Sequence, residues 1–346
     1  MKSIFWILSG SNGATFIINT KSFSFVLRSL KFFKARTFLT TLKKIGLSLS
    51  SILVGKLYRK KLKTAEQIEL YLYEAFNTSI NFGINEDVAV LISPSRDKVI
   101  VNHKNTHFQK FAFGTSYAKV KNEATIYSLF KTRPRSFQIS ELQDFTEIEN
   151  KYCSFILNNN KIQKKSKEKY SLAQTMVEFF QVSPSGEISF HAYIDQLLNT
   201  LENLDLSQFR ILEDHLSDLK LKSESVILPL GLVHNDFKTW NVIRYDKILI
   251  FDFEEADLQG MPMFDLFNFY CDPNVRYISA KELTKTIFSQ DNIKIYQEYL
   301  RLLKINLSFV CLLDFYLIKR ILFWHAAKEQ KTATDYLGLF KFIHSK

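Results

Sequence analysis

A polar loop between short apolar runs, in the last third of the chain, constrains the fold more than any other segment. It reads Leu232-Val-His-Asn-Asp-Phe-Lys-Thr-Trp-Asn-Val242 and leads into Ile248-Leu-Ile-Phe-Asp-Phe-Glu254. Short β-branched and apolar runs on either side of polar residues predict strands joined by loops. The fold must therefore carry Asp252 at the end of a buried strand, close to the polar loop that precedes it.

This arrangement suits phosphoryl transfer. The reaction requires metal ions that bridge the phosphates, a carboxylate that orients the nucleophile and positive charge beside the transferred group. We expect Asp236 to accept a hydrogen bond from the substrate hydroxyl, and Asn241 and Asp252 to hold Mg²⁺. His234 would be structural and would pack the loop against the strand that carries Asp252. A surface loop can contain His, Asp and Asn without a function, but the joint pattern favours a kinase.

Residues 234–269 resemble the aminoglycoside phosphotransferase and choline kinase superfamily. Its motif reads His-Gly-Asp-x-x-x-x-Asn and then Ile-Asp-Phe/Trp-Glu; here Asn235 replaces the commonest Gly, as in choline and ethanolamine kinases. The resemblance implies a two-lobed protein-kinase-like fold of the α+β class and the use of ATP. It also implies that Asp265 supports the catalytic loop from a helix start, a role compatible with a plain helix cap. The chain is further similar to uncharacterised bacterial phosphotransferase-like proteins of surface polysaccharide loci.

The first half of the chain offers a lysine and a glutamate with the spacing of an ATP-binding pair. Lys110 stands in the apolar run Phe108-Gln-Lys-Phe-Ala-Phe113, and Glu123 stands in the helical stretch that follows. By resemblance to the superfamily, Lys110 would neutralise the ATP phosphates and Glu123 would fix its side chain. An exposed lysine is common on strands, and Lys119 is the rival for this role. Lys110 is preferred because it lies inside the strand.

The glycine-rich loop of protein kinases is missing from the sequence. There is no glycine between Gly83 and Gly114, so the phosphates would have to meet backbone N–H groups of the turn Ser93-Pro-Ser-Arg-Asp-Lys98. This favours small-molecule kinases over protein kinases. Lys238 indicates the opposite, because Ser/Thr protein kinases carry a lysine two residues after the catalytic Asp that steadies the γ-phosphate. The alternative for Lys238 is an exposed loop lysine.

The order of the expected elements divides the chain into three segments. Residues 1–80 read as a basic helical extension, in which Phe and Leu recur at helical spacing among Lys and Arg. Residues 81–160 predict an ATP-binding lobe with an antiparallel sheet and one helix. Residues 161–346 predict a helical lobe that carries the catalytic loop and the substrate site.

Positive charge is concentrated at the start of the chain. The net charge is +11, but 13 Lys and Arg and no acid precede Glu66, so the remainder has a net charge of about −2. This distribution does not indicate a nucleic-acid partner. Residues 1–65 suit an anionic membrane surface; the alternative is that their apolar residues pack on the lobes. No run is long enough for a signal peptide or a membrane span, and three dispersed cysteines indicate a reducing compartment, so we expect a cytoplasmic protein. If residues 1–65 bind the membrane, the protein would be peripheral to its inner face.

The sequence therefore predicts an ATP- and Mg²⁺-dependent phosphotransferase that acts on a hydroxyl of a sugar, an amino alcohol or a glycolipid. A choline-like acceptor would need aromatic faces, to which Phe269, Tyr270 and Trp324 could contribute, although such residues are more often core. A nucleotide-binding pseudokinase and a membrane-surface scaffold are the alternatives. No pattern identifies the acceptor, the choice between ATP and GTP, or the oligomeric state.

Overall fold

The computed structural model describes most of the chain. The described residues are 5–9, 13–19, 26, 63–77, 82–84, 88–103, 107–130, 134, 136–148, 151–158, 170–204, 209–222, 226–244, 248–272 and 274–345. The chain divides into two compact units, one comprising Met1–Ser128 with Ser140–Lys161 and the other Leu129–Ile139 with Ile162–Lys346.

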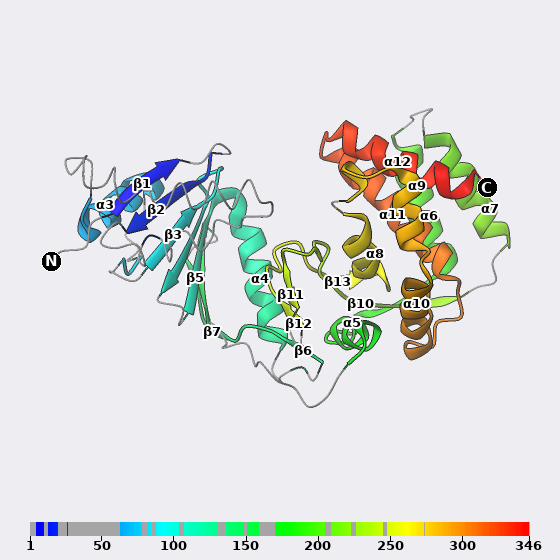
Figure 1. The fold of residues 1–346 in the computed structure, drawn as a ribbon, viewed down its shortest axis with the longest axis horizontal. Coiled ribbons are helices and arrows are strands. Elements are labelled where there is room, and N and C mark those ends of the chain that lie inside the picture. Colours follow the sequence, from blue (N-terminus) through cyan, green and yellow to red (C-terminus); the bar gives the residue numbers. More distant parts are fainter. Residues whose placement is uncertain are drawn as a thin grey trace. The chain divides into compact units, whose positions relative to one another are not determined.

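The first unit is built on a seven-stranded sheet (Figure 1). Its strands are rich in β-branched and aromatic residues, which suit a pleated and partly buried surface. In spatial order they are β1 (Phe5–Ser9), β2 (Thr15–Asn19), β3 (Val88–Ile92), β4 (Lys98–His103), β5 (His107–Phe113), β8 (Tyr152–Asn158) and β7 (Leu142–Ile148). Every neighbouring pair is antiparallel, so the expected antiparallel sheet is present. Helix α4 (Tyr117–Leu129) follows β5, as the sequence predicted.

A second helix, α3 (Ala65–Phe76), packs on this sheet. It begins at a capping box in which the Thr64 side chain accepts the N–H of Gln67, and the Gln67 side chain accepts the N–H of Thr64. Such a box satisfies backbone donors that the first turn of a helix leaves over. Ile68 and Leu72 point into the same fully buried cluster as the apolar residues of the strands. The helix is therefore part of the core of the unit.

The expectation of a helical extension over residues 1–80 is wrong at its start. β1 and β2 form a hairpin, and β2 joins the sheet by pairing with β3, with Thr15 opposite Ile92. The two runs are short and apolar with several β-branched residues, and pairing satisfies their backbone N–H and C=O groups. It also buries Phe5 completely. The expected basic helix over residues 22–62 lies almost entirely outside the described residues.

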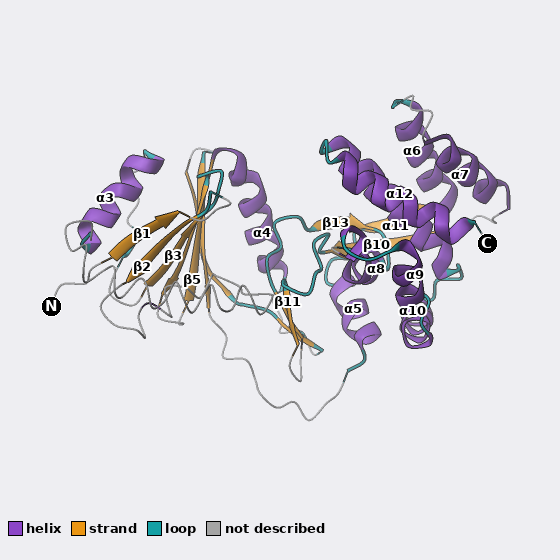
Figure 2. Cartoon of the chain, turned by 45° about the horizontal axis from the view of Figure 1, so that its top comes forward, coloured by secondary structure: helices purple, strands orange, loops and turns teal. Residues whose placement is uncertain are grey.

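The second unit is mostly helical, with two small three-stranded sheets (Figure 2). One sheet has the order β13 (Asp257–Gly260), β10 (Ile227–Val233) and β9 (Gly186–Ser189), and the other has the order β11 (Val242–Arg244), β12 (Ile248–Ile250) and β6 (Phe137–Gln138). The helices are α5 (Leu172–Phe180), α6 (Phe190–Glu202), α7 (Arg210–Lys222), α8 (Phe264–Cys271), α9 (Ala280–Ile287), α10 (Gln290–Leu302), α11 (Phe309–Ala326) and α12 (Gln330–His344). The α+β class is confirmed. Residues 129–139, expected in the ATP-binding lobe, belong here because β6 pairs with β12.

Helix α11 forms the centre of the helical core. Most of its residues are buried, among them Leu313, Phe315 and Ile318, and a helix that is apolar on nearly all sides belongs in the interior of a domain. Within the described part of the chain, no helix combines the length and the apolar character that crossing a bilayer requires.

Two glycines allow β10 to approach its neighbours closely. Gly231 lies opposite Gly260 in the ladder between β10 and β13. A Cβ on Gly231 would lie 2.4 Å from the carbonyl oxygen of Phe180, and a Cβ on Gly260 would lie 2.1 Å from Val233. Any side chain at these positions would push the neighbouring elements away. The close packing fixes the end of β10, where the polar loop begins at His234.

Candidate active site

A buried carboxylate fixes the first residues of the polar loop. Asp265, in the first turn of α8, accepts the backbone N–H of His234 at 2.7 Å and that of Asn235 at 3.0 Å. Burial raises the pKa of the Asp265 carboxyl to about 6, although these two donors oppose the shift. Asn235 has a left-handed φ of 59°, which Asn tolerates better than most residues. Asp265 thus stabilises the loop in a backbone conformation that is unfavourable for most residues.

The His234 ring connects the loop to the segment that carries Asp252. Its Nε2 lies 3.0 Å from the carbonyl oxygen of Phe251, and its Nδ1 lies 3.3 Å from the backbone N–H of Asp236. A carbonyl can only accept and an N–H can only donate, so a single proton on Nε2 satisfies both contacts. The ring is fully buried and packs on Phe253, with 5.0 Å between ring centroids.

The Asp236 carboxylate is held on both of its oxygens. Asn241 Nδ2 donates to Asp236 Oδ2 at 2.6 Å and to the Asp236 carbonyl oxygen at 3.0 Å. The other carboxylate oxygen, Oδ1, forms an ion pair with the Lys238 ammonium group. Because Asn241 directs its NH₂ group to Asp236, its amide oxygen remains as a potential metal ligand. The loop therefore orients the carboxylate and presents an oxygen donor five residues later.

Lys238 has a second carboxylate partner that the sequence did not reveal. Its Nζ lies 3.2 Å from Asp272 Oδ2, and its ammonium lies 5.3 Å from the centroid of the Trp240 ring. Asp272 is 3% exposed, and the guanidinium of Arg320 donates to the same Oδ2 at 2.7 Å. A buried carboxylate needs such partners. Asp272 and Arg320 together keep Lys238 beside Asp236.

Asp272 carried one signal that sequence reasoning could have used. It is the C-cap residue of α8, and an acid at the C-terminal end of a helix is opposed by the helix dipole. An acid at that position therefore favours a positively charged partner from another part of the chain. Which partner it has cannot be read from the sequence, because Arg320 lies 48 residues away.

Asp252 lies just beyond β12 in a strained backbone conformation. Its φ is 72°, a left-handed value that non-glycine residues adopt infrequently and that is enriched at active sites. One carboxylate oxygen of Asp252 and one of Glu254 lie within 4.8 Å of each other. Glu254 was not among the expected ligands, because the left-handed conformation at Asp252 that brings the two carboxylates together cannot be read from the sequence. Together with the Asn241 amide oxygen, these groups are all oxygen donors, the type that Mg²⁺ prefers.

The first unit brings Lys110 and Glu123 together. Lys110 Nζ lies 2.5 Å from Glu123 Oε2, and the two residues are 8% and 1% exposed. Lys110 lies on β5 opposite Phe155, whose ring centroid is 5.7 Å from the ammonium. Lys119, the rival, lies on the exposed side of α4. The structure thus pairs Glu123 with the lysine that lies inside the strand.

The turn between β3 and β4 differs from expectation. The N–H of Ser93 donates to the Lys98 carbonyl, that of Arg96 donates to the Ser93 carbonyl, and those of Asp97 and Lys98 donate to Ser93 Oγ. Asp97 also accepts from three hydroxyl groups, those of Ser93, Ser95 and Thr115. Burial alone would raise the pKa of Asp97, but these donors hold it well below its usual range. In this conformation four of the turn's N–H groups are occupied and an anion lies beside them, so the turn is a poor phosphate cradle.

Of the three aromatic residues considered for a choline-like pocket, Phe269 and Tyr270 pack on each other, with 5.4 Å between ring centroids. Trp324 faces the guanidinium groups of Arg276 and Arg320, at 4.6 and 5.1 Å from its ring centroid. Phe269 packs on Phe237, and Tyr270 packs on Tyr296. Trp324 therefore already has the protein's own cations against its ring, and the other two rings pack with core aromatics.

Comparison with protein families supports the resemblance seen in the sequence. Residues 185–285 match the model of the phosphotransferase enzyme family. This segment contains the polar loop, Asp252 and Asp265, so the resemblance to aminoglycoside phosphotransferases and choline kinases is confirmed where the motifs lie. No curated protein matches the sequence significantly.

Several solved structures resemble the chain at low identity. A thermostable mutant of aminoglycoside phosphotransferase APH(4)-Ia in complex with ADP and hygromycin B is 13% identical, with 79% of this chain and 96% of that chain covered and a TM-score of 0.45. A GDP complex of an aminoglycoside 2'-phosphotransferase is 11% identical over 79% and 96% of the two chains, with a TM-score of 0.47. The amicoumacin kinase hAmiN, in complex with AMP-PNP, Ca²⁺ and its ligand, is 13% identical over 73% and 89%, with a TM-score of 0.41.

Proposed function

We propose, from the phosphotransferase match of residues 185–285 and the geometry around Asp236, that the protein transfers a phosphoryl group from ATP to a hydroxyl of a small molecule. The observation that carries this proposal is the double hold on the Asp236 carboxylate, by Asn241 on one oxygen and by Lys238 on the other. An incidental acid on a surface loop does not require such orientation. A catalytic carboxylate does, because a preoriented group needs no reorganisation when the substrate binds.

Asp236 would accept the hydrogen bond of the attacking hydroxyl and take its proton as the bond to phosphorus forms. Lys238 would place its ammonium beside the transferred group and neutralise part of its charge. Asp272 keeps this ammonium close by, since its Oδ2 lies 3.2 Å from Lys238 Nζ. His234 and Asp265 are positioning residues that fix the loop from its buried side.

Magnesium, when bound with ATP, would supply positive charge that offsets the negative charge of the phosphates. The residues present fit this ion, because Asn241, Asp252 and Glu254 offer only oxygen atoms. The left-handed φ of 72° at Asp252 costs about 1–3 kcal/mol for a residue other than glycine. Such a cost is retained where it aims a side chain at a ligand. In the first unit, Lys110 would bind the ATP phosphates and Glu123 would hold its ammonium in place.

We propose the acceptor only as a class of compound, a small molecule that carries a hydroxyl group. A sugar, an amino alcohol and a glycolipid all present the required hydroxyl. A choline-like acceptor is the weakest of these, since Trp324 already packs on Arg276 and Arg320. A cytoplasmic location and contact of residues 1–65 with an anionic membrane also remain proposals.

The proposal is tested with full-length protein, ATP, Mg²⁺ and a panel of hydroxyl acceptors, with ADP release as the readout. Asp236→Asn should retain the fold and ATP binding but lower turnover by about 10²–10⁴-fold, as expected for loss of a general base. The matched control is Asp214→Asn, the same change on the exposed face of α7, which should leave turnover unchanged. Near-normal turnover of the Asp236 variant would remove this residue from the mechanism. Normal binding of ATP and Mg²⁺ by the wild type, with no ADP release on any acceptor, would instead favour the pseudokinase.

A further inference from the structure

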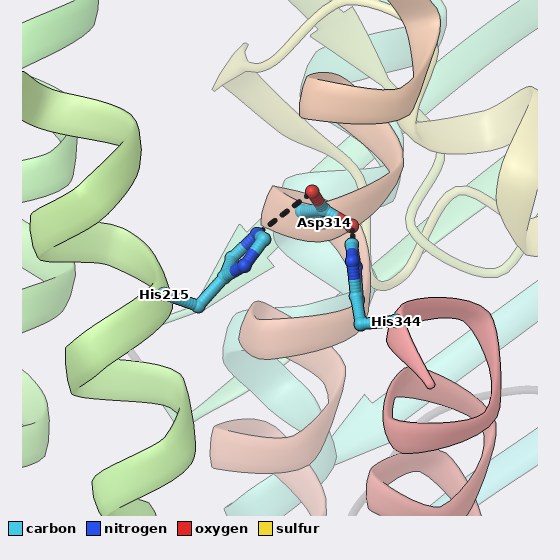
Figure 3. Close-up of side chains that lie close together, drawn as sticks. All are labelled: His215, Asp314 and His344. Atoms are coloured by element: carbon cyan, nitrogen blue, oxygen red, sulfur yellow. Dashed lines mark hydrogen bonds and ion pairs between the residues drawn. The ribbon is translucent and has the colours of Figure 1, made fainter. Parts of the chain in front are cut away.

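Two histidines and a buried aspartate from three helices converge in the second unit. Figure 3 shows His215 from α7, Asp314 from α11 and His344 from α12. His215 Nε2 lies 2.9 Å from Asp314 Oδ2, and His344 Nε2 lies 2.8 Å from Asp314 Oδ1. None of the three contributes to the contacts of the candidate active site. Their convergence is independent of the phosphotransferase proposal.

Asp314 is a buried carboxyl group whose side-chain partners are two imidazoles. It is 1% exposed, and among the residues that the structure describes its ion-pair partners are His215 and His344. A protonated imidazole would compensate the carboxylate by itself, whereas a neutral imidazole donates a hydrogen bond but brings no positive charge, so a metal ion and protons would compete for the cluster. Burying a carboxylate is unfavourable unless a charge or a metal ion accompanies it. The cluster therefore has the donors of a cation site and a reason to bind a cation.

We propose that His215, Asp314 and His344 form a structural site for a divalent transition-metal ion of the zinc type. Each residue offers one ligand atom, and these atoms all lie within 4.8 Å of one another. Zinc bonds of about 2.0–2.2 Å in a tetrahedral site separate neighbouring ligand atoms by roughly 3.3 Å. His215 and His344 approach different oxygens of Asp314, at 2.9 and 2.8 Å, so an ion between the imidazoles would meet both carboxylate oxygens, and each nitrogen–oxygen distance would have to open by about half an ångström. Two imidazoles select zinc and its neighbours over magnesium, which prefers oxygen ligands.

The surroundings of the cluster suit a structural ion that enters from solvent. The side chains of His215 and His344 are 21% and 26% exposed, whereas that of Asp314 is almost entirely buried. The buried ring of Phe340 packs against both imidazoles, with centroid distances of 5.1 and 4.6 Å. His344 belongs to the last turn of α12. An ion at this point would fasten the end of that helix to α7 and α11, with a water completing the coordination.

The test uses full-length protein that has been treated with chelator and returned to buffer with excess Mg²⁺, which occupies sites made of oxygen ligands. Calorimetric titration with Zn²⁺ should show one equivalent bound, and the melting temperature should rise with added Zn²⁺. His215→Gln and His344→Gln should each lower the affinity by more than about 100-fold, since even residues that only support metal ligands contribute about 10–100-fold. Each should also abolish the zinc-dependent rise in melting temperature.

The matched control is His325→Gln, the same change at a histidine in the last turn of α11 whose ring contacts Gln330. It should bind one equivalent of Zn²⁺ like the wild type. The melting temperature of each variant without metal shows whether it is folded. Of the two substitutions, His344→Gln should disturb the core least, because His344 lies close to the end of α12. Folded variants that bind Zn²⁺ as the wild type does would overturn the proposal, as would a wild type that binds none. Asp314 would then be stabilised by hydrogen bonds from the imidazoles alone.

Discussion

Replacing Lys110 with Met should affect both stability and ATP binding, and a second substitution should separate the two effects. Lys110 and Glu123 are 8% and 1% exposed and form an ion pair of 2.5 Å. Removal of one partner from a buried pair costs about 3–5 kcal/mol, because the other charge stays buried. Since Lys110 retains slight exposure, we expect the lower end of this range. Lys110→Met should therefore lower the free energy of unfolding by about 3 kcal/mol, measured by urea denaturation.

The double variant Lys110→Met with Glu123→Gln removes the buried charge as well. It should recover most of the lost stability, but its affinity for ATP and Mg²⁺, measured by calorimetry, should stay as weak as that of Lys110→Met. Lys119→Met is the control: an exposed change on α4 that should alter the free energy of unfolding by less than about 0.5 kcal/mol and leave ATP binding intact. If Lys119→Met weakens ATP binding more than Lys110→Met does, the assignment of the strand lysine is refuted.

Three further predictions follow from the contacts of individual residues. Gly260→Ala should lower the free energy of unfolding by about 1–3 kcal/mol, because its Cβ would lie 2.1 Å from Val233. Gly338→Ala is the control, since its Cβ would have open space around it, and this change should not lower the free energy of unfolding. Thermal denaturation of the two variants tests the difference. Burial raises the pKa of Asp265 to about 6, so the folded protein holds this proton more tightly than the unfolded chain, and its contribution to stability should grow as the pH falls from about 6 to about 4. Asp265→Asn should lack this contribution, so urea denaturation should show the wild type gaining on the variant over that range. A chain that starts at Thr64 lacks β1 and β2 and exposes the edge of β3, so it should aggregate. If this shortened chain is soluble and loses only its binding to anionic liposomes, residues 1–63 serve to bind a membrane instead.

The centre of the candidate site could be predicted because its residues are close in sequence. Asp236 and Asn241 lie on one short loop and are hydrogen-bonded to each other, and Phe251, next to Asp252, donates its backbone N–H to the Asn241 carbonyl. The support from Asp272 and Arg320 could not be predicted in the same way. Their contacts depend on how α8 and α11 pack, which is decided by the whole core of the second unit.

The strands at the start of the chain show why short apolar runs are ambiguous. β1 and β2 have five residues each, too few for a period of two to be distinguished from a helical pattern. The helical spacing of Phe and Leu among Lys and Arg favoured a helix for the whole segment, whereas pairing with the edge of β3 makes this part a strand. The expectation for the turn at Ser93 rested on the missing glycine-rich loop and left out the side chains of the turn. The Ser93 hydroxyl accepts two of the backbone N–H groups that were expected to meet the phosphates.

The ion pair between Lys238 and Asp236 raises a question of mechanism, because the ammonium occupies an oxygen of the carboxylate that would accept the substrate hydroxyl. The second partner of Lys238 offers an answer. When a substrate hydroxyl donates to Asp236, the ammonium can keep Asp272, whose Oδ2 lies 3.2 Å away, and turn toward the incoming phosphoryl group. Arg320, 2.7 Å from the same oxygen, holds Asp272 in place while this happens. We therefore expect that Asp272→Asn would leave Asp236 more tightly paired with Lys238, and that turnover would fall while ATP affinity changed little. Equal losses in both quantities would show instead that Asp272 serves only to keep the second unit folded.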